Sequence, residues 1–203
     1  MSIRNVVFDV GNVLFAYRPS AILDALLPQT PHKEFYLSSL VNNPIWDALD
    51  RGDLSAEEAA HRVSHRQEDA SRKKSDMLLF IDQFADHLDL IEPSKTLFLE
   101  LSQKMPVYIL SNFQSMPFKR LLAANPFMDE AKGRIVSEDV RLAKPEKAIY
   151  ELLLSQFSLN PQETLFLDDK IENIEACHEV GMNGIVFQTY DQVIREMRRF
   201  DYV

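Results

Sequence analysis

Cysteine is almost absent from this sequence. Cys177 is the single cysteine among 203 residues, so the chain cannot form an intrachain disulfide, and a reducing compartment is the simpler assumption. Long apolar runs are absent too, since no run approaches the ~18 residues of a membrane-spanning helix. The chain opens on a strand-like segment rather than on the basic and cleavable apolar stretches of a secretory signal. We therefore expect a cytoplasmic protein without a membrane partner.

Basic residues are outnumbered. The sequence holds 22 Lys and Arg against 31 Asp and Glu, which gives a net charge of −9. This balance argues against a nucleic-acid binder, because such proteins need a basic surface. Anionic substrates remain compatible with it, since a metal ion or a local lysine can hold a phosphate inside an acidic protein. Hydrophobic residues make up 46% of the chain, enough for the core of one large domain or of a domain with an inserted module.

Short apolar runs alternate with helical patterns along most of the chain. The runs predict buried strands at residues 6–8, 107–110, 164–167 and 184–187, with a further short strand at 134–136. Helices are predicted at residues 117–124, 144–154, 171–180 and 192–200. Gly181 is a stop signal for the third of these helices. Strands alternating with helices are typical of an α/β fold with a parallel sheet.

A polar stretch after the first strand differs from the rest. It shows helical periodicity and almost no strand-like run. Ser55 with Glu58 forms a capping box, which predicts a helix that begins just after Ser55. We interpret residues 16–86 as an inserted helical module, and residues 1–15 and 87–203 as the sheet-containing core.

Polar residues follow three of the predicted strands. Asp9 ends the first, Ser111 and Asn112 end the second, and Asp168 and Asp169 end the third. The carboxyl ends of parallel strands lie along one edge of a sheet, where open α/β proteins bind their ligands. Each motif alone is also compatible with an ordinary solvated turn. Together they predict a site at this edge.

The residue types at these strand ends suit a divalent metal. Mg²⁺ prefers oxygen ligands and usually takes one or two carboxylates together with phosphate oxygens of the substrate. Asp9 with Asp168 or Asp169 would supply such ligands. A metal-neutralised phosphate could then be attacked by Asp9 to form an aspartyl-phosphate.

Lys144 is a further candidate for phosphate binding. Pro145 fits the first turn of a helix, which places Lys144 close to the helix N-terminus. A lysine is unfavourable there, because it cannot accept a hydrogen bond and its charge opposes the helix dipole. A bound anion would relieve this conflict, although the side chain could instead reach solvent. Ser111, the backbone of Asn112 and Lys144 would then hold the phosphate oxygens.

Taken together, these motifs resemble the haloacid dehalogenase superfamily of hydrolases over essentially the whole chain. The matching segments are residues 8–14, 109–112, 144–145 and 166–169, with Asn173 four residues after Asp169. The resemblance implies a Rossmann-like core with an inserted helical cap, and a small phosphorylated metabolite as substrate. It also implies that Asp9 is the nucleophile, with Lys144 beside it, and that the enzyme depends on Mg²⁺.

The resemblance extends to individual metal ligands. By position, Asp169 would bind Mg²⁺ directly, and Asp168 would be its neighbour or a ligand through water. The backbone carbonyl of Gly11 would be another ligand. Ser111, Asn112 and Lys144 would bind phosphate.

One departure from the family pattern concerns catalysis. Most phosphatases of this superfamily carry a second aspartate two residues after the nucleophile, and this chain has Gly11 there. That aspartate is the general acid and base, a role typically worth ~10²–10⁴ in rate. The Gly11-Asn12 pair resembles a bacterial subgroup similar to sugar-1-phosphate phosphatases, whose leaving group needs less help. A sugar phosphate is therefore the expected substrate.

Three alternatives stay open. A 2-haloacid dehalogenase would suit Gly11, because its aspartate attacks carbon without a metal, but it would not need the acidic pair Asp168 and Asp169. A phosphomutase would need the missing base. A non-catalytic domain that binds a phosphate ligand would leave Asp9 and Lys144 without a chemical role. In the helical module, we interpret Trp46 as a core residue. The sequence indicates no particular oligomeric state.

Overall fold

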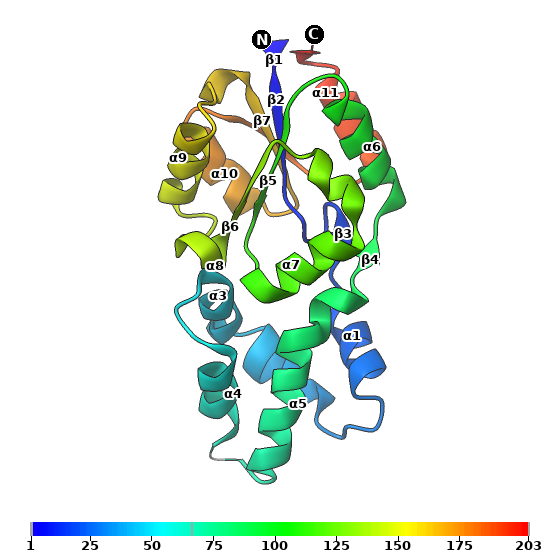
Figure 1. Cartoon of the computed structure of the whole chain (residues 1–203), viewed down its shortest axis with the longest axis vertical. Helices are drawn as coiled ribbons and strands as arrows, with labels where there is room; N and C mark the ends of the chain where they lie inside the picture. Colours follow the sequence, from blue (N-terminus) through cyan, green and yellow to red (C-terminus); the bar gives the residue numbers. More distant parts are fainter. Residues whose placement is uncertain (1, 66, 203) are drawn as a thin grey trace.

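The computed structural model describes residues 2–65 and 67–202. Its centre is a five-stranded parallel sheet with the strand order β6-β5-β2-β7-β8 (Figure 1). The strands are β2 (Asn5–Phe8), β5 (Val107–Ser111), β6 (Gly133–Val136), β7 (Thr164–Asp168) and β8 (Asn183–Val186). The strand order reverses at β2, so β2 lies between β5 and β7, as in doubly wound folds. The predicted α/β, Rossmann-like parallel sheet is confirmed.

The strands read as continuous apolar runs because both faces of the sheet are covered. Along β2, Val6 and Phe8 belong to one hydrophobic cluster, whereas Val7 belongs to another. Successive side chains of a strand point to opposite faces, so these two clusters lie on the two sides of the sheet. A strand buried on both faces cannot alternate apolar with polar residues, which explains the sequence pattern.

Helices cover each face of the sheet. On one face lie α9 (Lys147–Gln156) and α10 (Ile171–Glu179); on the other lie α6 (Glu92–Ser102), α7 (Ser115–Ala124) and α11 (Tyr190–Met197) (Figure 1). Gly181 follows α10 with a φ of 83°, a left-handed conformation that glycine adopts without strain. The terminal helix begins at Tyr190, two residues before the predicted start, because Thr189 and Gln192 form a capping box.

The segment between β3 (Phe15–Ala16) and β4 (Asp89–Leu90) is helical. It contains α1 (Pro19–Leu26), α2 (Lys33–Tyr36), η1 (Leu37–Val41), α3 (Pro44–Arg51), α4 (Ala56–Ser64), α5 (Ala70–Gln83) and η2 (Phe84–His87). We call these elements the helical segment. β3 and β4 pair antiparallel, so the two chain crossings into this segment lie side by side. The segment lies beyond the carboxyl ends of the sheet strands (Figure 1).

The predicted capping box in this segment is present. The Ser55 hydroxyl accepts a hydrogen bond from the Glu58 backbone N–H at 3.2 Å, and the Glu58 carboxylate accepts one from the Ser55 N–H at 2.9 Å. These bonds pair backbone donors at the start of α4 that would otherwise lack partners.

The other elements connect or finish this architecture. They are β1 (Ser2–Ile3), which pairs with β9 (Asp201–Tyr202), η3 (Pro126–Glu130), α8 (Ser137–Val140) and η4 (Pro161–Glu163). Across the described residues, every helix is too short or too polar to traverse a lipid bilayer.

Candidate active site

The acidic residues predicted at the strand ends meet at one edge of the sheet. Asp9 directly follows β2, and Asp168 is the last residue of the neighbouring strand β7. Asp9, Asp168 and Asp169 each offer a carboxylate oxygen, and these oxygens lie within 4.8 Å of one another. Ser111 ends β5 on the other side of β2 and lines the same cavity as Asp9. The parallel register of β2 with both neighbours brings these four residues together.

Lys144 lies between two of the carboxylates. Its Nζ is 2.7 Å from Asp9 Oδ1 and 2.7 Å from Asp168 Oδ2, and its side chain is 2% exposed. Burial alone would lower the pKa of Lys144, but Asp168 and Asp9 raise it above its usual value. The ammonium group therefore keeps its proton and partly neutralises the acidic cluster.

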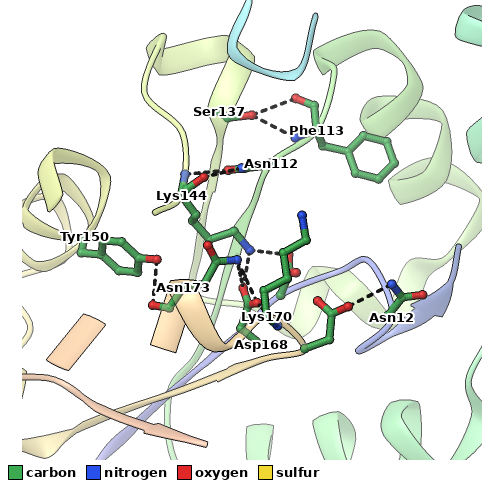
Figure 2. A network of polar contacts seen from close by, with 11 residues as sticks. Asn12, Asn112, Phe113, Ser137, Lys144, Tyr150, Asp168, Lys170 and Asn173 are labelled. Atoms are coloured by element: carbon green, nitrogen blue, oxygen red, sulfur yellow. Dashed lines mark hydrogen bonds and ion pairs between the residues drawn. The ribbon is translucent and has the colours of Figure 1, made fainter. Parts of the chain in front are cut away.

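The predicted place of Lys144 at a helix N-terminus is wrong. Helix α9 begins at Lys147 with Glu146 as its N-cap, so Lys144 belongs to the preceding loop. Asn112 holds this loop: its Oδ1 accepts from the Lys144 N–H, and its Nδ2 donates to the Lys144 carbonyl, both at 2.8 Å (Figure 2). The side chain can therefore turn into the site, where two carboxylates stabilise its charge more than a helix end could.

Asp168 is fully engaged by protein donors. Its Oδ1 accepts from the Lys170 backbone N–H at 2.9 Å, and the Asn173 Nδ2 donates to both of its oxygens at 2.9 and 3.0 Å (Figure 2). Asn173 is fixed in turn, because its carbonyl accepts from the Tyr150 hydroxyl at 2.9 Å. These contacts orient the Asp168 carboxylate toward Lys144.

Asp169 is half-buried and retains a free oxygen. Its Oδ2 accepts a hydrogen bond from Asn12 Nδ2 at 3.0 Å, whereas its Oδ1 makes none within the described residues. Asn12 has a φ of 54°, a left-handed conformation that asparagine tolerates better than most residues. Its Oδ1 also accepts from the Tyr17 N–H at 3.0 Å. Sequence reasoning missed this role of Asn12, and the Gly11-Asn12 turn signal was the one clue to it.

The electrostatics of the cluster favour a further cation. Burial raises the pKa of Asp9 to about 7, with Lys144 opposing the rise and Asp168 adding to it. Burial also raises the pKa of Asp169. Three carboxylates face a single buried ammonium, and the donor atoms that they offer to a metal are oxygens. Gly11 lines the same cavity. This donor set fits Mg²⁺.

A cavity of about 130 Å³ joins the strand ends to the helical segment. The sheet side contributes Asp9, Gly11, Ser111, Asn112, Lys144 and Asp169. The facing side includes Tyr17, Trp46, Asp50 and Phe84. Trp46 is a core residue as predicted, since it is buried with its ring centroid 5.1 Å from that of Phe84. Sequence reasoning did not single out Asp50.

Comparison with known proteins agrees with this geometry. A family model described as haloacid dehalogenase-like hydrolase matches residues 3–181.

The chain belongs to this family of hydrolases.

This hydrolase is similar to two phosphatases. It is 28% identical to the sesquiterpene phosphatase astK of Aspergillus oryzae, over 90% of this chain and 88% of the relative. It is also 28% identical to the D-ribitol-5-phosphate phosphatase of Bacteroides thetaiotaomicron, over 88% of this chain and 89% of the relative. Among solved structures, a haloacid dehalogenase family enzyme from Bacteroides thetaiotaomicron, in complex with magnesium and inorganic phosphate, superposes with a TM-score of 0.72. That structure covers 96% of this chain and is itself covered completely; at 19% identity, the likeness concerns the fold.

Proposed function

We propose that this hydrolase is a Mg²⁺-dependent phosphatase that cleaves a small phosphate monoester through an aspartyl-phosphate on Asp9. The observation that carries the proposal is the cluster of three carboxylates, those of Asp9, Asp168 and Asp169, with the buried ammonium of Lys144. Asp9, Asp169 and Lys144 line one cavity. Positive charge beside a buried carboxylate is what an anionic substrate and its transition state require. A metal-free 2-haloacid dehalogenase has no comparable need for the extra acidic residues.

The metal ligands follow from which oxygens are free. Asp9, Asp169 and the Gly11 carbonyl would hold Mg²⁺, because both oxygens of Asp168 already accept hydrogen bonds from the protein. When bound, Mg²⁺ would neutralise phosphate charge at the site. Asp168 would act as a neighbour of the metal site by keeping Lys144 in place.

The remaining residues would bind and orient the ester. The Asp9 carboxylate would attack phosphorus while the bond from phosphorus to the leaving oxygen breaks. Ser111, the backbone of Asn112 and the Lys144 ammonium would hold the other phosphate oxygens. The side chain of Asn112 would contribute by positioning Lys144, since both of its polar atoms bind the Lys144 backbone.

We further propose that residues 1–15 and 87–203 act as the core and residues 16–86 as a cap that closes over the cavity. The paired crossings β3 and β4 support this division. Arg51 of α3 also forms an ion pair with Glu146, in the loop that carries Lys144. A closed cap would exclude water and would strengthen the electrostatic contacts around the phosphate.

The facing wall of the cavity supports a sugar phosphate as the substrate. Tyr17 and Trp46 are stacked with a centroid distance of 6.2 Å, and such aromatic surfaces suit the apolar face of a sugar ring. The Tyr17 hydroxyl is buried and makes no hydrogen bond within the described residues, so a substrate hydroxyl could pair with it. The proposed substrate is a small phosphorylated metabolite. We propose a cytoplasmic location, where such metabolites occur.

The test is release of inorganic phosphate from para-nitrophenyl phosphate and from a panel of sugar phosphates, with Mg²⁺ or with chelator. We expect phosphate to be released in the presence of Mg²⁺ and not in the presence of chelator. Asp9→Asn should abolish turnover and still give a folded circular dichroism spectrum with a cooperative melting transition, whereas Asp129→Asn, a change at an exposed carboxylate, should be fully active. Halide release from 2-haloacids without metal would contradict the proposal. Metal and phosphate binding without any turnover would instead favour a non-catalytic domain.

A further inference from the structure

The side chain that Gly11 lacks leaves room beside the nucleophile. A Cβ atom built on Gly11 would meet no heavy atom within 4 Å, and Gly11 lines the same cavity as Asp9. A leaving oxygen bound beside Gly11 would have no proton-donating side chain from residue 11, in the turn after β2. A proton donor supplied by the protein would therefore come from another element that faces the cavity.

Few ionisable groups of the described residues face the cavity from outside the acidic cluster and Lys144. They are Tyr17, Asp47, Asp50 and Lys170. Burial, followed by the charge of Asp50, raises the pKa of Tyr17 well above its usual value, which makes it a weak acid. Lys170 and Asp47 are exposed to solvent. Asp50 is the one buried carboxyl in this group.

The last turn of α3 holds Asp50 rigidly against the strand-end loops. Its carbonyl accepts a hydrogen bond from the Ser137 hydroxyl, which itself accepts from the Phe113 N–H at 2.9 Å. Its Oδ1 accepts from Gln114 Nε2 at 3.3 Å. Its Oδ2 makes no hydrogen bond within the part of the chain that the structure describes. Asp50 therefore presents one free carboxyl oxygen from a fixed backbone.

The neighbouring turn shows how closely α3 packs on the sheet side. Gly52 adopts a left-handed φ of 79°, and a Cβ there would come within 3.0 Å of Glu138 Cγ on α8. This close packing ties the end of α3 to α8, the short helix that follows β6. Asp50 is thus carried by the helical segment but anchored at the sheet edge.

From this juxtaposition we propose that Asp50 is the general acid that protonates the leaving oxygen, in place of the carboxylate missing at Gly11; this rests on the proposed phosphatase function. In the first step Asp9 attacks phosphorus, the bond to the leaving oxygen breaks, and that oxygen takes the proton of the Asp50 carboxyl. In the second step water attacks phosphorus and gives a proton to the Asp50 carboxylate, while the bond between phosphorus and the Asp9 oxygen breaks. Phosphate leaves, and both aspartates return to their starting states.

The surroundings of Asp50 match this role. The groups that face it are Gln114, Asp47, Lys170, Glu138 and Tyr17. Burial raises its pKa to about 7, Asp47 and Glu138 add to the rise, and Gln114 and Lys170 oppose it. A donor is most efficient when its pKa lies near the working pH, because it then both holds and releases its proton readily.

The experiment compares two substrates of nearly equal shape in the full-length enzyme with Mg²⁺. The nitrophenolate of para-nitrophenyl phosphate leaves without a proton, whereas phenyl phosphate has a more basic leaving oxygen. We expect Asp50→Asn to lower kcat/KM for phenyl phosphate by ~100-fold or more and for para-nitrophenyl phosphate by less than ~10-fold. Asp50→Glu should restore part of the loss. Asp24→Asn, the same change at an exposed carboxylate of α1 outside the cavity, should affect neither substrate.

The pH dependence of kcat/KM is a second measurement, and it would not depend on Asp50 if this residue only supported the structure. Asp50 loses its proton as pH rises through its pKa, so the wild type then loses what Asp50→Asn already lacks. For phenyl phosphate, the kcat/KM of the wild type divided by that of Asp50→Asn should fall as pH rises from about 6 to about 8.

Two results would overturn the inference. An equal loss on both substrates, or a ratio that does not change with pH, would remove Asp50 as the acid while the phosphatase function stands, provided that Asp9→Asn is inactive. Failure of the wild-type enzyme to release phosphate from either ester would overturn the phosphatase function and this inference together.

Discussion

Replacing Lys144 by methionine tests the electrostatic core of the site. The Lys144 side chain is 2% exposed, and its Nζ lies 2.7 Å from a carboxylate oxygen of both Asp9 and Asp168. Methionine keeps a long apolar stem and removes the charge. Removing one partner of a buried ion pair costs ~3–5 kcal/mol, because the other charge is left uncompensated. Because two carboxylates lose their partner, we expect the upper part of that range, a large share of the ~5–15 kcal/mol that stabilises a typical domain.

The assay is urea unfolding with chelator present, at a pH of about 8, where ordinary carboxyl groups are ionised. With a denaturant slope of ~3 kcal/mol per molar, the midpoint of Lys144→Met should fall by ~1–2 M without a change in slope. Lys147→Met is the matched control, three residues along the chain. Lys147 and Glu151 form an ion pair whose side chains are 55% and 58% exposed, and exposed pairs contribute only ~0–1 kcal/mol.

A second variant makes the reasoning refutable. If uncompensated charge causes the loss, adding Asp9→Asn to Lys144→Met should recover ~1–3 kcal/mol, a coupling typical of residues in direct contact. A Lys144→Met protein that unfolds within ~1 kcal/mol of the wild type would show that the buried charges are compensated elsewhere. Absence of any recovery in the double variant would refute the assignment of the loss to Asp9.

Three further predictions concern Gly11, Asp50 and Ser55. Gly11→Asp should fold, since a Cβ there meets no atom within 4 Å, and it should speed phenyl phosphate hydrolysis more than para-nitrophenyl phosphate hydrolysis; equal effects on both would contradict a role as the missing acid. Asp50→Asn should raise the free energy of unfolding at a pH of about 8 by up to ~4 kcal/mol but not at about pH 4, because a carboxyl with a raised pKa destabilises the fold only as pH rises above its unfolded value. Urea midpoints at both pH values check this, and a gain at low pH would refute it. Ser55→Ala should cost ~1 kcal/mol through loss of the α4 cap, with kcat/KM unchanged, whereas a melting temperature equal to that of the wild type would show that the cap is not needed.

Local chemistry was enough for much of the fold. Runs such as residues 6–8 are apolar at every position because both faces of the sheet are covered. Consecutive residues are therefore enough to predict that these strands are buried. The capping box at Ser55 and the left-handed Gly181 are likewise short-range signals, and both predict the helix end that the structure shows. Polar residues at three strand ends sufficed to predict a common site, since parallel strands share one carboxyl edge.

The direction of Lys144 could not be read from its neighbours. Its local context suggested a helix N-terminus, yet hydrogen bonds to Asn112, 32 residues away, hold its backbone in a loop. The hydrogen bond between Asn12 and Asp169 joins residues 157 positions apart, and a local sequence pattern cannot predict such a pair.

The sequence by itself determined the buried strands, the start of α4, the end of α10 and the acidic residues at the strand ends, because each depends on residues close together in the chain. Tertiary structure alone decided that Lys144 would sit between Asp9 and Asp168, and that α3 would bring Asp50 to the same cavity. The physical reason is that these contacts depend on how separate elements pack, and the free energy of that packing belongs to no single stretch of sequence.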